Sequence, residues 1–184
     1  MPEHLNGDLI RRAQEGEPSV VGEIYERYQR GIYRYLYYRI GDLHTAEDLT
    51  SEVFLRMIEK LPNYSGHSLA FRAWLFQIAR NLSIDHYRRM SVRKNVQLVE
   101  EHPEGKDEPL EMITKELTSQ KLYHALVKLP ENQRDVIVMR FVVGMPVREV
   151  AETLHKSENS VKGLQRRALK SLRETLVEWE VTYV

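Results

Sequence analysis

Residues 146–173, PVREVAETLHKSENSVKGLQRRALKSLR, have the pattern of two short helices joined by a tight turn. Pro146 suits the first helical position, because it lacks only an N–H that would be unpaired there. We expect His155 and Lys156 to form the turn, and the Ser157 hydroxyl to cap the second helix. An apolar stripe at helical spacing marks the first helix: Val147, Val150, Ala151 and Leu154. The segment therefore has the outline of a helix-turn-helix.

The second helix of this segment has an apolar side and a cationic side. A helical wheel places these residues inward: Val161, Leu164, Ala168, Leu169, Leu172 and Leu176. The cations on the other side are Lys162, Arg166, Lys170 and Arg173. Asn159, Gly163 and Gln165 lie near its start, where they suit contact with base edges and close approach to DNA. A lone basic helix is more often only solvated surface, but the preceding helix and turn favour nucleic-acid binding.

The composition predicts small helical domains. Hydrophobic residues make up 42% of the 184 residues and charged residues 29%, which is typical of amphipathic helices. No stretch has the pattern of a β-sheet. The length allows one domain or two small ones. We expect an all-α fold with two helical domains, 1–91 and 110–184, joined by a flexible acidic linker, 92–109, and with the helix-turn-helix in the second domain.

Charge is unevenly distributed, although 27 Lys and Arg balance 27 Asp and Glu. Residues 72–94 contain six basic side chains and one acid, and residues 162–173 contain five basic side chains and no acid. Residues 100–116 contain seven acids and two lysines. Two basic surfaces that flank an acidic connector favour a polyanionic partner. The connector by itself is equally well explained as a solubilising spacer.

Several classes of protein are disfavoured by the sequence. The chain has no cysteine, and its seven histidines are scattered without metal-ligand spacing. It has neither a glycine-rich phosphate loop nor a Ser, His and Asp grouping in a motif context. We therefore expect no enzyme activity, no cofactor and no metal. Because the N-terminus lacks a signal-peptide core and no span approaches 20 apolar residues, we expect a cytoplasmic protein without membrane insertion.

The N-terminal half begins with three predicted helices. Their ranges are 8–15, 19–40 with Gly41 as its C-terminal cap, and 45–61, which Pro62 ends. The apolar stripe of the second includes Tyr25, Tyr28 and Tyr35. In the third, residues 45–48 resemble a capping box, and the inner stripe is Ala46, Leu49, Val53, Met57 and Leu61. Its polar outer face, which by default is only solvated, is Asp48, Ser51, Glu52 and Arg56.

A polar loop and another amphipathic helix follow. Residues 63–68, NYSGHS, favour a turn, and the next helix directs Leu75, Ala79 and Leu82 inward. Another face of that helix has an aromatic ring, two amides and a cation: Trp74, Gln77, Asn81 and Arg88. Such a face beside a polar loop suits unstacked bases. The plainer alternatives are that Trp74 is a packing residue and that Arg88 and Arg89 are cations at a helix C-terminus.

Together these stretches resemble the extracytoplasmic-function (ECF) group of bacterial sigma factors in the sigma-70 superfamily, the subunits that direct RNA polymerase core to promoters. The likeness covers nearly the whole chain. AEDLTSEVFLR (46–56) resembles the polymerase-binding helix of sigma region 2, and FRAWLFQIARNLSIDHYRR (71–89) resembles its helix for the −10 element. Residues 129–173 resemble the helix-turn-helix of region 4. Domain 1–91 is accordingly expected to be region 2, and domain 110–184 to be region 4.

The resemblance implies three sites. The first site would bind the clamp helices of the largest polymerase subunit, and it consists of the face Asp48, Ser51, Glu52 and Arg56. At Ser51 the sequence departs from a glutamine of the family. The second site would bind bases of the −10 element, and its residues are Asn63, Tyr64, Ser65, His67, Trp74, Gln77, Asn81 and Arg88. The third, for the −35 major groove, is Ser160, Lys162, Gly163, Arg166, Arg167 and Lys170. Leu164 and Leu169 depart from arginines common in the family.

The resemblance thus implies a promoter-specificity factor without chemistry of its own. Its partners would be RNA polymerase core, through the clamp helices and the flap, and promoter DNA, both duplex and single-stranded. An anti-sigma protein is a further partner common in the family. The alternative is an autonomous helix-turn-helix regulator that binds an operator as a dimer. Residues 63–89, which a duplex-only operator binder does not need, and the lack of an obvious dimerising helix favour the sigma factor.

Overall fold

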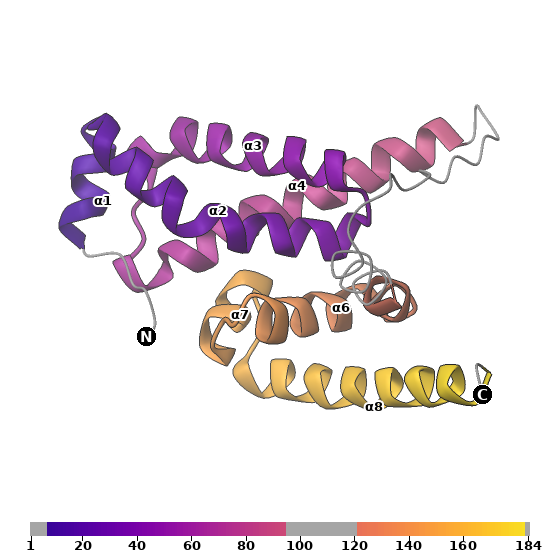
Figure 1. Cartoon of the computed structure of the whole chain (residues 1–184). Coiled ribbons are helices and arrows are strands. Elements are labelled where there is room, and N and C mark those ends of the chain that lie inside the picture. Colours follow the sequence, from indigo (N-terminus) through magenta and orange to yellow (C-terminus); the bar gives the residue numbers. More distant parts are fainter. Residues whose placement is uncertain (1–6, 95–120, 183–184) are drawn as a thin grey trace.

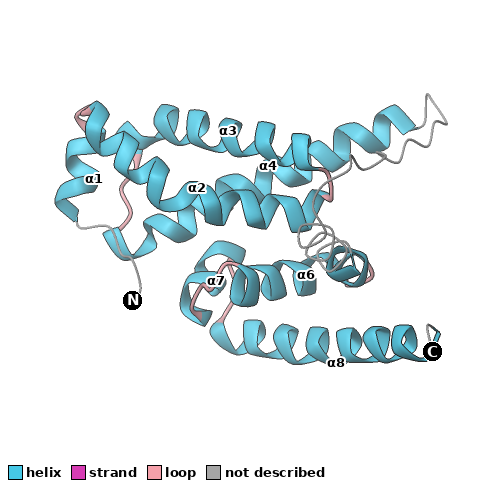
Figure 2. Ribbon diagram, in the orientation of Figure 1, coloured by secondary structure: helices cyan, strands magenta, loops and turns pink. Residues whose placement is uncertain are grey.

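The computed structural model describes residues 7–94 and 121–182, and every regular element in these two ranges is a helix (Figure 2). The all-α fold predicted from the sequence is confirmed. We call residues 7–94 the N-terminal module and residues 121–182 the C-terminal module. Residues 1–6, 95–120 and 183–184 lie outside the described residues. The predicted linker 92–109 falls in this undescribed part of the chain from residue 95 onward.

The N-terminal module consists of four helices and two short 3₁₀ turns. The helices are α1 (Gly7–Gln14), α2 (Pro18–Ile40), α3 (Leu43–Lys60) and α4 (Phe71–Lys94). The turns η1 (Leu61–Asn63) and η2 (Ser68–Ala70) lie between α3 and α4. The C-terminal module contains a helical stretch at 121–127, α6 (Glu131–Ile137), the π-helical turn η3 (Val138–Val142), α7 (Val147–Leu154) and α8 (Glu158–Thr182).

Helix α2 ends where the sequence predicts. Gly41 has a φ of 83°, a left-handed conformation that glycine adopts without steric cost, and its N–H donates to the Tyr37 carbonyl. Tyr28 and Tyr35 are buried as expected. The inward assignment of Tyr25 was wrong, because its side chain is 43% exposed. Its ring packs edge-on against Phe54, with the centroids 4.7 Å apart, at the margin of the core.

Helix α3 begins earlier than predicted. Asp42, rather than a capping box at 45–48, is its N-cap, and the Asp42 carboxylate accepts a hydrogen bond of 2.7 Å from the Thr45 N–H. Aspartate is among the strongest N-caps, and the helix can begin here because Gly41 has just ended α2. The hydrogen bond from Thr45 lowers the pKa of Asp42. The helix ends at Lys60, two residues before Pro62.

The helix-turn-helix is formed by α7 and α8. Pro146 is the N-cap of α7 rather than its first helical residue, because its ψ of 155° is extended while its φ of −65° is compatible with both states. His155 ends α7 in the left-handed region, with a φ of 51°. The Ser157 hydroxyl accepts a hydrogen bond from the Ser160 N–H at 3.2 Å. The predicted turn and cap are therefore confirmed.

The two modules pack directly against each other. Helix α7 lies against α4, and η3 lies against α2, so that the C-terminal module covers one side of the N-terminal module (Figure 1). The buried apolar side chains of the two modules form one continuous cluster. Polar contacts cross the same boundary, since the Thr153 hydroxyl donates to the Ala73 carbonyl at 3.3 Å. The sequence patterns predicted the helices but not this docking.

Candidate nucleic-acid and polymerase interfaces

Helix α8 has a cationic outer face. The residues predicted for duplex DNA all lie on this helix, and Ser160, Lys162, Arg166, Arg167 and Lys170 are exposed. Gly163 is half-buried, and a Cβ atom there would lie 3.5 Å from the Arg167 guanidinium. No acid occurs between 162 and 173. Because these cations face solvent, they are available to phosphate groups.

The inner side of α8 packs on α6 and α7. Val161, Ala168 and Leu172 are buried there. The inward assignment of Leu169 was wrong, since its side chain is 43% exposed. On a wheel of about 100° per residue, Leu169 lies about 80° from Val161, at the edge of the apolar arc, where the neighbouring helices no longer cover it. The side chain of Leu176 lies outside the described part of the chain.

The loop between α3 and α4 presents polar side chains on an aromatic support. Asn63, Ser65 and His67 are exposed. The Tyr64 ring lies 4.7 Å from Trp74 and 5.4 Å from Phe71, centroid to centroid, and its hydroxyl donates to the His67 carbonyl at 2.9 Å. Burial raises the pKa of Tyr64 to about 12. Tyr64 and Trp74 therefore belong to the support of this loop rather than to its open surface.

The support also explains the glycine of the loop. A Cβ atom at Gly66 would lie 2.4 Å from the Tyr64 hydroxyl, closer than any side chain can approach. The Tyr64 carbonyl additionally accepts a hydrogen bond of 2.7 Å from Gln14, which ties the loop to α1. The plainer interpretation of Trp74, as a partly buried packing residue, is the one the structure favours.

The predicted polar face of α4 is divided by the docking of the modules. Asn81 and Arg88 are exposed, and Arg88 lies 4.0 Å from the Asp85 carboxylate. Gln77 instead is half-buried, and its side-chain amide donates to the Glu152 carbonyl of α7 at 3.1 Å. An open cleft of about 540 Å³ lies at this point between the modules, and its lining includes Gln77 and Arg148. The structure therefore keeps Asn81 and Arg88 accessible but engages Gln77 within the protein.

The outer face of α3 is accessible. Asp48 and Ser51 are exposed, and Glu52 is paired with Arg56 one turn later, with Arg56 Nε 2.8 Å from Glu52 Oε1. Leu55 extends the same face and is 58% exposed, which the sequence interpretation missed. The sequence did indicate this position, because Leu55 lies outside the apolar stripe of the helix. It follows Ser51 by four residues and Glu52 by three, so it shares their face.

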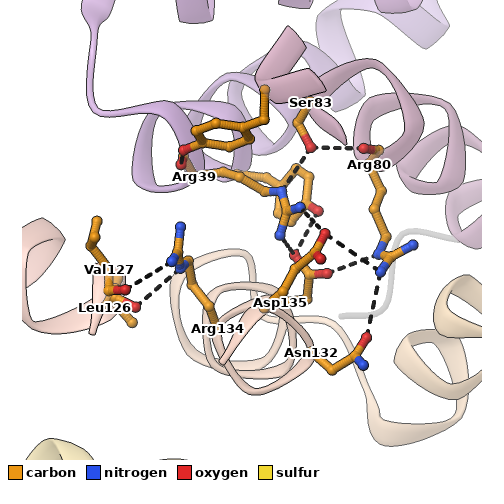
Figure 3. A network of polar contacts seen from close by, with 11 residues as sticks. Arg39, Arg80, Ser83, Leu126, Val127, Asn132, Arg134 and Asp135 are labelled. Atoms are coloured by element: carbon orange, nitrogen blue, oxygen red, sulfur yellow. Dashed lines mark hydrogen bonds and ion pairs between the residues drawn. The ribbon is translucent and has the colours of Figure 1, made fainter. Parts of the chain in front are cut away.

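A buried charge lies between the modules, and the sequence interpretation missed it. The Asp135 side chain in α6 is 0% exposed. Its carboxylate accepts hydrogen bonds from the Tyr35 hydroxyl at 2.9 Å, from Arg39 at 2.5 Å and from Arg80 at 2.8 Å (Figure 3). We call Tyr35, Arg39, Arg80 and Asp135 the Asp135 cluster. The sequence did carry a sign of this buried charge, because Arg39 follows Tyr35 by four residues and so places a cation within the apolar stripe of α2. In the structure Arg39 is buried.

Arg39 makes further contacts that complete its hydrogen bonding. Its Nε donates to the Ser83 hydroxyl at 2.7 Å, and its other terminal nitrogen pairs with Glu131. Burial alone would lower the pKa of the Arg39 guanidinium, but the neighbouring Tyr35, Asp135 and Glu131 side chains raise it above its usual range. Arg39 therefore keeps its charge although it is buried, and this charge is balanced by acids of the C-terminal module.

Two other kinds of feature, a membrane-spanning helix and a metal-binding cluster, are absent from the described residues. No helix within 7–94 or 121–182 is both long and apolar enough to cross a membrane. In the same ranges, no group of three or more His, Asp or Glu side chains is arranged to hold a metal ion.

Known proteins share both the sequence and the fold of this chain. Residues 24–92 match the family described as Sigma-70 region 2, and residues 125–174 match Sigma-70, region 4. The ECF RNA polymerase sigma factor BldN of Streptomyces coelicolor is 37% identical over 171 residues, which are 92% of this chain and 65% of that protein. This chain thus spans slightly less than two thirds of that relative's length.

A second relative is covered more completely. The ECF RNA polymerase sigma factor SigX of Bacillus subtilis is 31% identical over 157 residues, which are 82% of this chain and 80% of that protein. The fold is similar to that in a solved structure of CnrH in complex with the cytosolic domain of CnrY, with a TM-score of 0.74, 23% identity and coverage of 92% of this chain and 96% of that one. On these grounds the chain belongs to the ECF group of RNA polymerase sigma factors.

Proposed function

We propose that this protein directs RNA polymerase core to specific promoters and starts transcription there, without a chemical reaction of its own. The observation that supports this most strongly is the order of two matches in one chain, region 2 followed by region 4, together with the exposed cationic face of α8. None of the comparisons favours an autonomous dimeric regulator. The proposed place of action is the cytoplasm, where RNA polymerase works.

The C-terminal module would read duplex DNA at the −35 element. In a helix-turn-helix the second helix enters the major groove with its N-terminal residues toward base edges. Here Ser160, Lys162 and Gly163 occupy that end of α8. Arg166, Arg167 and Lys170 follow along the helix, where their exposed charges would pair with phosphates and fix its orientation.

The N-terminal module would act on the −10 element. The exposed side chains of Asn63, Ser65 and His67 would receive a base that has left the stack, while Tyr64 and Trp74 hold the loop in shape from below. Asn81 and Arg88 would contact the adjoining bases and backbone. Gln77 would join them only after its bond to Glu152 breaks.

The outer face of α3 would bind RNA polymerase core. Asp48, Glu52 and Arg56 supply charge, and Leu55 adds an apolar contact of the kind found at the centre of protein interfaces. The division into residues 1–91, 92–109 and 110–184 belongs to this proposal. Because an anti-sigma protein is common in the family, such a partner is included as well.

Run-off transcription with RNA polymerase core and a randomised promoter library tests the proposal directly. We expect transcripts only when this protein is added, and the enriched promoters should share two separate elements. Footprinting without polymerase provides the contrast. If the protein shows no effect on core polymerase but protects a palindrome as a twofold-symmetric pair, the proposed function is wrong.

A further inference from the structure

One side chain of α1 holds the start of the loop between α3 and α4. The Gln14 side-chain amide donates to the Leu61 carbonyl at 3.0 Å and to the Tyr64 carbonyl at 2.7 Å. Leu61 is the first residue of η1, and Tyr64 is its C-terminal cap. Because a side-chain amide has two N–H donors, both donors of Gln14 are used within the protein. Gln14 therefore fixes the path by which the chain leaves α3 and enters the loop.

Helix α1 is itself firmly placed. Its side chains Ile10 and Ala13 are buried in the core, and the helix packs against α2 and η1. Gln14 follows Ile10 by four residues, so it lies on the same side of the helix one turn later, where it is half-buried. A loop that is hydrogen-bonded to a packed helix keeps its shape better than one held by an exposed side chain. The amide thus connects the loop to the core of the N-terminal module.

Tyr64 is held at two points. Gln14 binds its backbone carbonyl, and the Tyr64 hydroxyl donates to the His67 carbonyl at 2.9 Å. The His67 carbonyl also accepts a hydrogen bond of 2.9 Å from the Ala70 N–H, just before α4 begins. Ser65 and His67, which follow Tyr64 in the loop, have exposed side chains. The relative positions of these exposed side chains therefore depend on Tyr64, and the position of Tyr64 depends on Gln14.

We propose that Gln14 is a positioning residue that sets which base the loop accepts at the −10 element. It acts through Tyr64 and holds the exposed side chains of the loop in one arrangement, while its own donors are occupied by the protein. A site selects one base over another only if its polar groups are fixed, because a loose group adjusts to the wrong partner. This inference rests on the proposed function as a sigma factor, and it adds a residue that precedes the stretch 24–92 matched to region 2. The competing explanation is that Gln14 only stabilises the module.

The variant Gln14→Glu tests this in the full chain. A carboxylate has nearly the shape of the amide but no N–H donor, and it would face two carbonyl oxygens. Run-off transcription with core polymerase is measured on a promoter from the library selection and on its single-base variants in both elements. For the unmodified protein, a wrong base should cost about tenfold or more. In Gln14→Glu the cost at the −10 position read by the loop should fall to about twofold, while the cost of wrong bases in the −35 element should not change.

Two further variants separate the loss of the donors from other effects. Gln14→Met removes the donors without adding a charge, so it should lose discrimination at the same −10 position. Gln29→Glu makes the same chemical change as Gln14→Glu on the exposed face of α2, and it should behave like the unmodified protein. If either variant of Gln14 keeps the full base preference at the −10 element, whether or not total transcription falls, the residue does not position the loop and the inference is wrong.

A second measurement does not depend on transcription. Trp74 packs against the Tyr64 ring, so its access to a soluble quencher reports how firmly the loop is closed. The chain has two tryptophans, and Trp179→Phe leaves Trp74 as the only one. In this background Gln14→Met should raise the acrylamide quenching constant about twofold at unchanged helix content, because the loop opens more often.

The two measurements distinguish the proposals. Unchanged quenching in Gln14→Met would show that the amide does not hold the loop, and it would overturn the inference. If quenching rises as expected but the unmodified chain gives no transcript with core polymerase, it is the sigma-factor function that fails, and the hold of Gln14 on the loop stands.

Discussion

The two modules present their proposed DNA-contacting helices in opposite ways. In the C-terminal module, α8 directs Lys162, Arg166 and Lys170 to solvent. In the N-terminal module, α4 exposes Asn81 but has Gln77 bonded to the Glu152 carbonyl. Both helices carry several basic side chains by sequence. The difference comes from what covers them, since α7 lies on α4 and the outer face of α8 is open.

Individual arginines show how differently a cation can be placed in this chain. Arg166 and Arg167 are exposed, whereas Arg39 is buried against acids of the other module. A chain with equal numbers of acids and bases can therefore have one face available to phosphates and another region that is internally neutralised. Basic residues alone do not show which helix is ready to bind DNA.

The largest expected effect separates polymerase binding from DNA binding. Glu52→Lys reverses a charge on the α3 face and replaces the pair with Arg56 by two cations one turn apart. Since like charges at an interface cost several kcal/mol, we expect binding to core polymerase to weaken at least about 100-fold. Co-purification measures this, with Glu26→Lys on α2 as the control for an exposed charge reversal. If Glu52→Lys still co-purifies, the docking face is assigned wrongly.

A second substitution tests the accessible part of α4. Asn81→Ala should impair open-complex formation about tenfold, because a good side-chain contact to a base contributes about 1–3 kcal/mol. Binding to a −35 duplex should not change, since Asn81 lies on α4 of the N-terminal module and not on the cationic face of α8. Permanganate footprinting measures the opening, and Gln29→Ala on α2 is the matched control for loss of an exposed amide. Unaltered melting in Asn81→Ala would contradict the proposed role.

The corresponding test on α8 should give a smaller effect. Arg166→Ala should weaken binding to a −35 duplex about fivefold at physiological salt, because one phosphate contact and its released counterion are lost. The slope of log K against log salt should decrease in magnitude by about 1. Titration at several salt concentrations measures both, with Arg30→Ala on α2 as the control. An unchanged slope would mean that Arg166 does not touch the DNA backbone.

The smallest effect concerns stability in the N-terminal module alone. Asp42→Ala removes the N-cap of α3 and should lower the free energy of unfolding by about 1 kcal/mol at pH 7. The hydrogen bond from Thr45 places the folded-state pKa of Asp42 below its unfolded value, which is about 3.9. The contribution of its charge is therefore present above that unfolded value and is lost as the pH falls through the folded-state pKa.

Asp42→Asn is the matched control for this cap. Asparagine keeps the acceptor oxygen, so stability at pH 7 should stay close to that of the unmodified protein. The variant has no carboxylate to titrate at this position, so the part of the free energy of unfolding that is lost at low pH through Asp42 should disappear. Urea unfolding at several pH values measures both. If Asp42→Ala unfolds like the unmodified protein at pH 7, the carboxylate does not stabilise α3. Binding to a −35 duplex should be unaffected in both Asp42 variants.

Much of the local structure was predictable from the sequence. The helix spans, the Gly41 and Ser157 caps and the cations of α8 follow from periodicity and capping rules that act within a few residues. Leu169 and Tyr25 were placed wrongly because each lies at the edge of an apolar arc, where the neighbouring element decides coverage. The functional roles of the individual site residues remain predictions.

The sequence by itself determined which segments are helical, which face of each is apolar, and that the chain combines sigma regions 2 and 4. Only the tertiary structure decided that α7 covers α4 and that Arg39 meets Asp135, a partner 96 residues away. The physical reason is that periodicity shows whether a side chain points inward, but not what it meets there. A buried cation in an apolar stripe requires a counter-charge, and only the docking of the two modules identifies it.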